Sequence, residues 1–183
     1  MGACRYTVNR AGVVTSVGGD WRAFARENDA PDGVDEGVGL SIWDACASAE
    51  TREVYRRLLD HALREGSVSF PYRCDSPGEE RELQMTIAAL PDGSGWEFIS
   101  EVREVRHAAV SPLALLDGAA TPDGGILCIC SWCARVDHAG VWADFADYVA
   151  ATALLAAEEL PAITHGICAE CHDRLLAEID ARR

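Results

Sequence analysis

The sequence contains no lysine, so all 16 of its basic side chains are arginines, and they stand against 30 acidic residues. The formal net charge is −14, and residues 1–106 carry 19 acids and 12 arginines while residues 107–183 carry 11 acids and 4 arginines. Each part therefore has a net charge of −7. Neither part offers the basic surface that binds phosphates, which disfavours nucleic acids and anionic membranes as partners.

Long apolar runs and targeting signals are also missing. No apolar run reaches the ~18 residues that span a bilayer. The N-terminal stretch lacks the charged region and the following apolar region of a secretory signal. Position 6, where a myristoylation motif has Ser or Thr, is Tyr6. We therefore expect a cytoplasmic protein that has no membrane partner.

Motifs of catalysis are absent as well. The sequence contains no P-loop, no GxGxxG and no Ser/His/Asp order typical of a hydrolase. The acidic pairs Glu79-Glu80 and Glu158-Glu159 are adjacent in sequence, so their side chains diverge. We interpret them as solvent-exposed charges. We predict that the protein is not an enzyme.

What is present is a foldable chain of 183 residues, 49% hydrophobic and 25% charged. β-Branched runs and apolar spacing predict, in order, strands at 5–9 and 13–17, a short helix at 21–27, a loop at 29–39, a helical turn from 41, a helix at 49–65 and strands at 67–74, 81–90 and 95–105. This order predicts an α+β fold, with an antiparallel sheet that has helices on one face.

The same order resembles the PAS family of sensory domains over residues 4–104. Four local motifs agree with it: the Gly12 turn, Gly-Asp-Trp21-Arg-Ala-Phe24-Ala, Val38-Gly39 before Ser41-Ile-Trp43-Asp, and Phe70-Pro-Tyr72-Arg-Cys-Asp75-Ser-Pro77. They look like a bacterial PAS-like subgroup. The resemblance implies a five-stranded antiparallel sheet and a sensory or protein-interaction role. We expect a PAS-like domain at 1–106, a linker at 107–125 and a second module at 126–183.

PAS-like folds enclose a small cavity between the helices and the sheet. The candidates for its lining are Trp21, Phe24, Trp43, Tyr55, Phe70, Tyr72, Met85 and Trp96. Ordinary core packing is the alternative for each of them, because aromatic side chains dominate cores. Cys46 does not stand in the Asn-Cys-Arg setting of flavin photochemistry, and His61 on the long helix leaves a haem-binding sensor open.

Cysteine is the most informative residue type. Of eight cysteines, Cys4, Cys46 and Cys74 are isolated, whereas five crowd into the last third. Two CxxC pairs, Cys130-Ser-Trp-Cys133 and Cys168-Ala-Glu-Cys171, are separated by 34 residues. Two such pairs can complete a tetrahedral Cys4 zinc site, and His165 is a candidate donor to a thiolate sulfur. Cys128 is too close to Cys130 to form the usual pair.

The last third also resembles a cysteine-rich tail of bacterial signalling proteins. The resemblance rests on Ile129-Cys-Ser-Trp-Cys133, Gly140-Val-Trp142 and His165-Gly-Ile-Cys-Ala-Glu-Cys171, and it implies that Cys130, Cys133, Cys168 and Cys171 bind one zinc ion. Ala169 replaces the usual Pro, and the spacer near 150–160 is longer. Helices predicted at 142–159 and 170–181 make this a small, mainly helical module.

Together these features predict a signalling module whose partner is another signalling protein or a second copy of itself. Three alternatives remain for the cysteines and histidines. Oxidation of the Cys4 site could release zinc, which would make the protein a redox or metal sensor. A CxxC pair could act as a catalytic dithiol without metal. Cys168-Ala-Glu-Cys171-His172 also matches the c-type haem attachment pattern.

Overall fold

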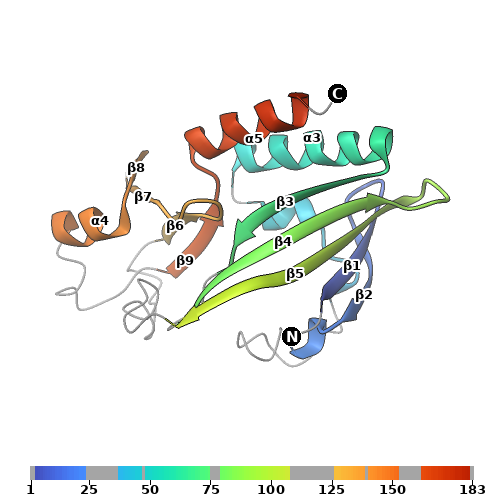
Figure 1. The fold of residues 1–183 in the computed structure, drawn as a ribbon, viewed down its shortest axis with the longest axis horizontal. Coiled ribbons are helices and arrows are strands. Elements are labelled where there is room, and N and C mark those ends of the chain that lie inside the picture. The colour runs from blue at the N-terminus through green and yellow to red at the C-terminus, as the bar shows by residue number, and fades with distance from the viewer. Residues whose placement is uncertain are drawn as a thin grey trace.

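The computed structural model describes residues 3–23, 37–46, 48–74, 79–107, 126–138, 140–152 and 162–181. A five-stranded sheet lies under the helices at residues 49–65 and 169–181, and a second, four-stranded sheet lies beyond the N-terminal ends of these helices (Figure 1). The candidate residue Phe24, most of the expected linker at 107–125 and the spacer residues 153–160 lie outside the described residues.

The larger sheet contains five antiparallel strands in the order β2-β1-β5-β4-β3. Their bounds are β1 (Cys4–Asn9), β2 (Val14–Gly19), β3 (Ser67–Arg73), β4 (Glu79–Ala89) and β5 (Gly95–His107). Side chains alternate along β1, where Val8 is fully buried and Arg5 pairs with Glu97 on the opposite face. This confirms the predicted α+β class and the five-stranded antiparallel sheet.

Helices α2 (Ile42–Ala45) and α3 (Ala49–Glu65) lie between β2 and β3 along the chain. The Ser48 hydroxyl caps α3 by accepting a hydrogen bond from the Thr51 N–H, and Gly66, with φ of 90°, ends it. The apolar stripe of α3 faces the sheet, and its buried members include Val54, Leu58 and Ala62. The bounds of this helix are those that its sequence spacing predicts.

A second sheet forms in the last third, with the order β8-β7-β6-β9. Its strands are β6 (Ile126–Cys130), β7 (Val136–His138), β8 (Val141–Ala143) and β9 (Ala162–Gly166), and its helices are α4 (Phe145–Thr152) and α5 (Ala169–Ala181). The expectation of a mainly helical module missed this sheet. Residues 142 and 143, expected at the start of a helix, belong instead to β8, which pairs with β7, and the helix begins only at Phe145.

The pairing of β6 with β9 decides where the cysteines lie. These two strands run parallel, so their carboxyl ends meet at one edge, and Cys130 is the register partner of Gly166. Gly166 allows the close approach, because a Cβ there would lie 2.8 Å from the Cys128 Sγ. The other side of this sheet packs against α4 through the buried side chains of Leu127, Ile129 and Val136.

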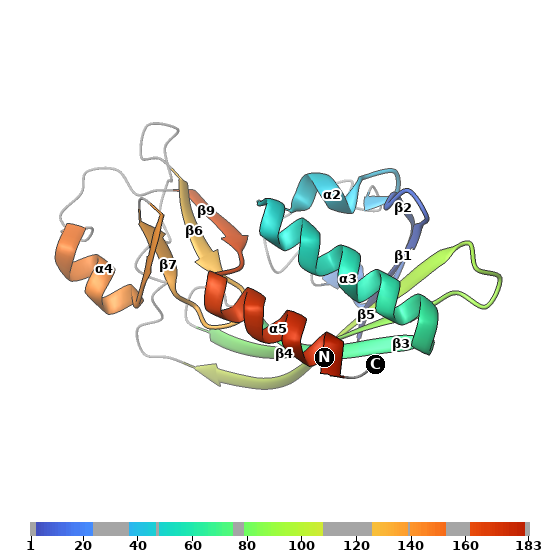
Figure 2. The same ribbon diagram turned by 90° about the horizontal axis from the view of Figure 1, so that it is seen from above.

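Helix α5 leaves the second sheet and packs beside α3 on the same face of the larger sheet (Figures 1 and 2). Leu175 and Ile179 of α5 belong to the same hydrophobic cluster as Leu58 and Phe98. The described parts of both halves therefore share one core, whereas the division into domains at 106 and 126 stays a prediction. Within the described part of the chain, no helix combines the length and apolarity that crossing a bilayer requires.

Candidate metal centre and adjoining cavities

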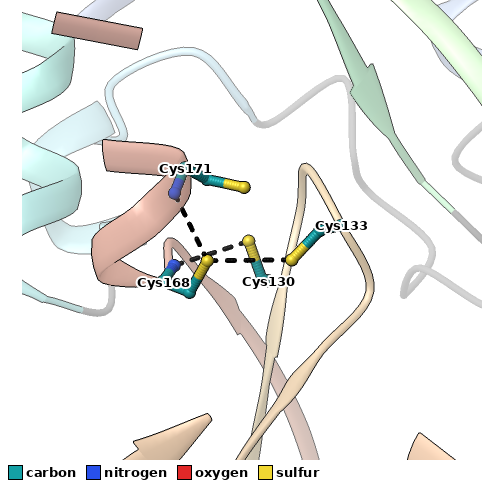
Figure 3. Close-up of side chains that lie close together, drawn as sticks. All are labelled: Cys130, Cys133, Cys168 and Cys171. Carbon is teal, nitrogen blue, oxygen red and sulfur yellow. Dashed lines mark hydrogen bonds between the residues drawn. The ribbon is translucent and has the colours of Figure 1, made fainter. Parts of the chain in front are cut away.

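Four cysteine side chains converge where β6, β9 and α5 meet (Figure 3). Cys130 is the last residue of β6, and the turn that follows brings Cys133 back over it, with the Ala134 N–H bonded to the Cys130 carbonyl. Cys168 immediately precedes α5, and Cys171 lies in the first turn of that helix. Both CxxC pairs thus sit at element ends that the parallel β6–β9 pairing places together.

The spacing of the sulfurs suits a tetrahedral ion. All four Sγ atoms lie within 4.8 Å of one another, and Cys133 Sγ lies 3.7 Å from Cys168 Sγ. Zn–S bonds of about 2.3 Å give a tetrahedron whose edge is about 3.8 Å. Cys130, Cys168 and Cys171 are buried and Cys133 is exposed. The four cysteines could therefore hold a metal ion, and their spacing is consistent with zinc.

Backbone N–H groups point at the sulfurs, as thiolate ligands require. Cys130 Sγ accepts from the N–H groups of Cys168 (3.4 Å) and Trp132 (3.5 Å). Cys168 Sγ accepts from the Cys171 N–H at 3.4 Å. Each turn of the CxxC pattern thus supplies a donor to its own first cysteine, and each such donor stabilises negative charge on sulfur.

The environment of the cluster, including the neighbouring thiols, shifts the pKa values of Cys130, Cys133 and Cys171. Burial raises the pKa of Cys130, but N–H groups of Cys168, Trp132 and Cys133 outweigh it, and its pKa falls below the ordinary value. Burial and then the neighbouring Cys130 raise the pKa of Cys133 to about 11, and the pKa of Cys171 also rises for these reasons. A cation bound among the sulfurs would favour their deprotonated forms.

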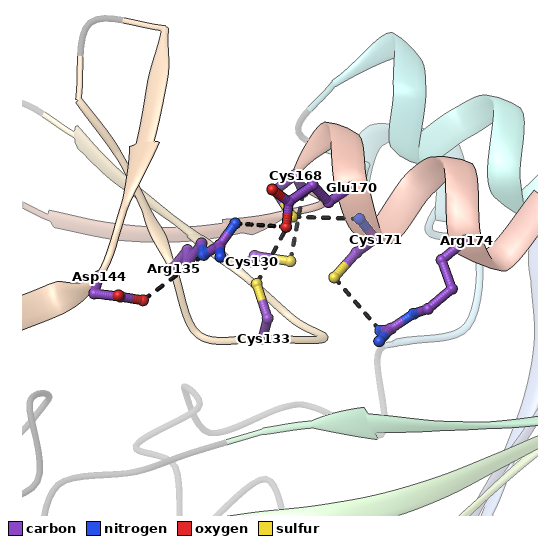
Figure 4. A network of polar contacts seen from close by, with 8 residues as sticks. All are labelled: Cys130, Cys133, Arg135, Asp144, Cys168, Glu170, Cys171 and Arg174. Carbon is purple, nitrogen blue, oxygen red and sulfur yellow. Dashed lines mark hydrogen bonds and ion pairs between the residues drawn. The ribbon is translucent and has the colours of Figure 1, made fainter.

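Two arginines lie close to the cluster (Figure 4). The Arg174 guanidinium donates to Cys171 Sγ at 3.5 Å. Arg135 is held beside Cys133 by Glu170, at 2.6 Å, and by Asp144, at 3.7 Å. Sequence reasoning missed Arg174, although its position three residues after Cys171 on a helix places the two side chains on one face. These cations offset part of the negative charge of a four-thiolate site.

His165, the predicted donor, is an exposed residue of β9. It lines a cavity together with Gly166 and Trp132. The contacts described above give the sulfurs their donors from backbone N–H groups and from Arg174, so a bond from His165 to a sulfur stays a prediction.

The remaining cysteines stand apart from the four. Cys128 is half-buried on β6 with its sulfur against Gly166, and burial followed by the charge of Asp137 raises its pKa. Cys46 is buried beside α2, where its Sγ donates to the Ile42 carbonyl at 3.3 Å. Cys4 and Cys74 line a cavity on the inner face of the larger sheet.

That cavity has a volume of about 390 Å³ and lies between the larger sheet and the segment around α2. Of the eight residues expected to line a cavity, Trp21, Tyr72 and Met85 lie on its wall. Tyr72 and two others, Tyr55 and Phe70, line a second cavity of about 200 Å³ next to it. The two spaces adjoin, because both are also lined by Tyr6, Ile42 and Ala45.

Trp43 and Trp96 are not among the residues that line either cavity. The Trp43 indole N–H donates to the Ala11 carbonyl at 3.0 Å, and the ring packs over Gly12, where no Cβ would fit. The Trp96 indole N–H donates to the Leu59 carbonyl at 3.1 Å within the core. Both side chains connect the larger sheet to neighbouring segments.

Two histidines that raised the question of haem occupy different settings. His61 is buried on α3, and its Nδ1 has no hydrogen-bond partner within the described ranges. It lines neither of the two cavities. The His172 side chain is only 15% exposed and lies between α5 and α3, 3.9 Å from Glu53.

No protein-family model matches this sequence, and a search of curated proteins finds no match to it either.

Proposed function

We propose that the chain is a signalling module in which a PAS-like sensory or interaction domain is built together with a structural zinc centre. The observation that carries the proposal is the convergence of Cys130, Cys133, Cys168 and Cys171, whose sulfurs all lie within 4.8 Å. The element order of the larger sheet, with its helices on one face and an inner cavity, supports the PAS-like part.

Zinc bound by these four thiolates would cross-link the turn after β6 to the start of α5. The ion has no redox chemistry and a closed Cys4 set leaves no open coordination position, so its role would be structural. Structural zinc contributes on the order of 10 kcal/mol to the folding of small modules. The surrounding N–H donors and Arg174 would lower the energy of the anionic site.

The module would act in the cytoplasm by binding a partner signalling protein or a second copy of the chain, and it would have no catalytic output. The net charge of −14 supports a protein partner over a nucleic acid or an anionic membrane. The proposed role therefore requires no catalytic residue.

The test is metal analysis of the purified full chain beside two variants. We expect one zinc ion per chain, and we expect the double variant Cys130→Ser/Cys133→Ser to bind none. Cys128→Ser is the matched control, because it changes a half-buried cysteine of the same strand that lies outside the cluster. A wild-type chain that takes up no zinc from a stoichiometric supply, or a Cys128→Ser variant that loses it, would contradict the proposal.

The exposure of Cys133 favours a second candidate, a redox sensor. Hydrogen peroxide could accept two electrons from the Cys133 and Cys168 thiolates, whose sulfurs lie 3.7 Å apart. The two sulfurs would join in a disulfide, the peroxide would become two hydroxide ions, and the site would lose two of its four ligands. Zinc release at peroxide concentrations that leave the circular dichroism spectrum unchanged would support this candidate, and retention of zinc until the protein denatures would exclude it.

A further inference from the structure

The larger of the two cavities has a volume of about 390 Å³ and lies apart from the cysteine cluster. On one side it is bounded by the inner face of the larger sheet, where Leu83 and Val102 line it. On the other side it is bounded by the segment around α2, where Leu40 and Ile42 line it. Its volume lies within the roughly 300–1,000 Å³ that is typical of sites for small organic molecules.

The side chains that line this cavity are mostly apolar. Aliphatic members such as Ile42 and Leu83 are joined by the aromatic rings of Tyr6 and Trp21. Cys4 and Cys74 add thiol groups, which pack as small and polarizable apolar groups. A molecule with aromatic rings can therefore leave water and make van der Waals contacts on several sides.

Charge is scarce in the lining. Among the lining residues that the structure describes there is no Arg or His, and Asp20 is the one with a charged side chain. Burial raises the pKa of Tyr72 to about 12, so its hydroxyl stays neutral near pH 7. An anionic ligand would lose its hydration without meeting a cation, and Asp20 would repel it. The lining therefore favours an uncharged ligand.

The hydroxyl groups of the lining already have partners within the chain. The Tyr72 hydroxyl and the Ser100 hydroxyl form a hydrogen bond with each other. The Ser41 hydroxyl accepts a hydrogen bond from the Trp43 backbone N–H at 3.2 Å. An apolar molecule can therefore fill the cavity without leaving these three hydroxyl groups unpaired, so it avoids the main penalty of burying polar groups.

The side of the cavity at α2 borders solvent. Leu40 lines the cavity and is also 64% exposed, and Ala45, a further lining residue, is exposed as well. A small molecule can therefore reach the cavity past these two side chains without opening the larger sheet.

We propose that the larger cavity binds an uncharged, largely apolar aromatic molecule and discriminates against anionic analogues of the same shape. The proposal rests on the proposed function in one respect, because it names the class of molecule that the sensory domain would detect. Burial of the apolar surface of the ligand supplies the affinity, whereas Asp20 and the lack of a cation among the described lining residues supply the selectivity.

N-Phenyl-1-naphthylamine is a suitable probe, because it is neutral and becomes fluorescent when it leaves water. The full chain, supplied with zinc, is titrated into about 1 µM probe while the emission is recorded. We expect saturable binding of one molecule per chain with a Kd of about 10 µM. 8-Anilino-1-naphthalenesulfonate has the same rings and one added sulfonate, and it should bind at least about ten-fold more weakly.

Substitutions that fill the cavity locate the bound probe. Val102→Phe adds volume on the side of the sheet and should weaken binding of the neutral probe at least about ten-fold. Ala45→Phe fills the space from α2 and should have the same effect, which keeps the test decisive if circular dichroism shows Val102→Phe to be unfolded. Ile99→Phe is the matched control. Ile99 follows the buried Phe98 on β5, so it points to the opposite face of the sheet, and its substitution should leave the affinity unchanged.

Three results would overturn the proposal. One is the absence of saturable binding of the neutral probe up to about 200 µM protein. Another is binding of the sulfonate as tight as that of the neutral probe. The third is an unchanged affinity for the neutral probe in the filling variants that fold.

The same samples separate this proposal from the metal centre. Metal analysis reports how much zinc each chain carries, independently of the probe. A chain that carries zinc but does not bind the neutral probe refutes the cavity proposal and leaves the metal centre intact. A chain that binds the neutral probe but takes up no zinc supports the cavity proposal and refutes the metal centre.

Discussion

The packing of α5 on α3 makes a quantitative prediction for Leu175→Ala. Leu175 is 5% exposed, and a cavity of only about 10 Å³ lies between it and Leu58, Val68, Phe70 and Ile179. The substitution removes three carbon atoms, which corresponds to about 2.4 kcal/mol of lost burial at 0.8 kcal/mol each. The tight surroundings add a cavity term, so we expect a loss of about 3 kcal/mol in the free energy of unfolding. For a chain of this length the melting temperature should fall by about 8 °C.

Leu175→Ala should lower the stability of more than its own helix. Because Leu175 and Phe98 belong to one hydrophobic cluster, the larger sheet should be destabilised together with α5. In hydrogen exchange of the zinc-loaded chain, the slowest amides of β5 should exchange about 150-fold faster in Leu175→Ala. Leu176→Ala, at a half-buried neighbouring position, is the matched control and should cost about 1 kcal/mol. Faster exchange confined to residues 126–181, with β5 unchanged, would refute the shared core and favour two independent domains.

Two further predictions concern backbone positions beside the cysteine cluster. Ala134 follows Cys133 with φ of 60°, a backbone conformation that favours glycine. Ala134→Gly should therefore raise the unfolding free energy of the zinc-loaded chain by about 1 kcal/mol in chemical denaturation. A loss of about 1 kcal/mol instead would show that the loop is unstrained. Gly166→Ala would place a Cβ 2.8 Å from the Cys128 Sγ, and it should lower the melting temperature by several degrees, at a cost of about 2 kcal/mol. Adding Cys128→Ala should restore most of this loss, and a double variant no more stable than Gly166→Ala alone would exclude the sulfur contact as its cause.

Local patterns predicted the first part of the fold well, because its elements carry their own signals. The helix at 49–65 has a Ser48 cap, an apolar stripe and a Gly66 stop, and all three act within a few residues of chain. The short stretches between neighbouring strands contain Gly, Asp or Pro, a composition that predicts turns. Turns of this kind favour antiparallel neighbours, so the larger sheet could be expected from sequence.

The last third was harder to predict because its sheet depends on distant pairing. Strands β7 and β8 have three residues each, too few to show a period. The apolar residues of 141–149 fit a helical pattern, but pairing with β7 assigns the first three to a strand. Strand β9 is recognisable only from its parallel partner β6, which lies more than 30 residues earlier.

For the candidate site, the spacing of the two CxxC pairs identified the four cysteines. Sequence could not show that Arg174 donates to Cys171, that Trp132 stacks on Phe70, or that His172 lies between two helices. Each of these contacts depends on how α5 and the β6 turn are oriented, and that orientation follows from packing across the whole chain.

Local sequence is sufficient to predict the long helix, the antiparallel strands and the identity of the clustered thiols, since these follow from periodicity, turn residues and ligand spacing within short stretches of chain. Packing across the whole chain places α5 on α3, closes a cavity between the cysteine loop and β3, and sets which donors face the sulfurs. Such contacts join residues far apart in sequence, and their free energy comes from burial and hydrogen bonding in the assembled fold, which no local pattern records.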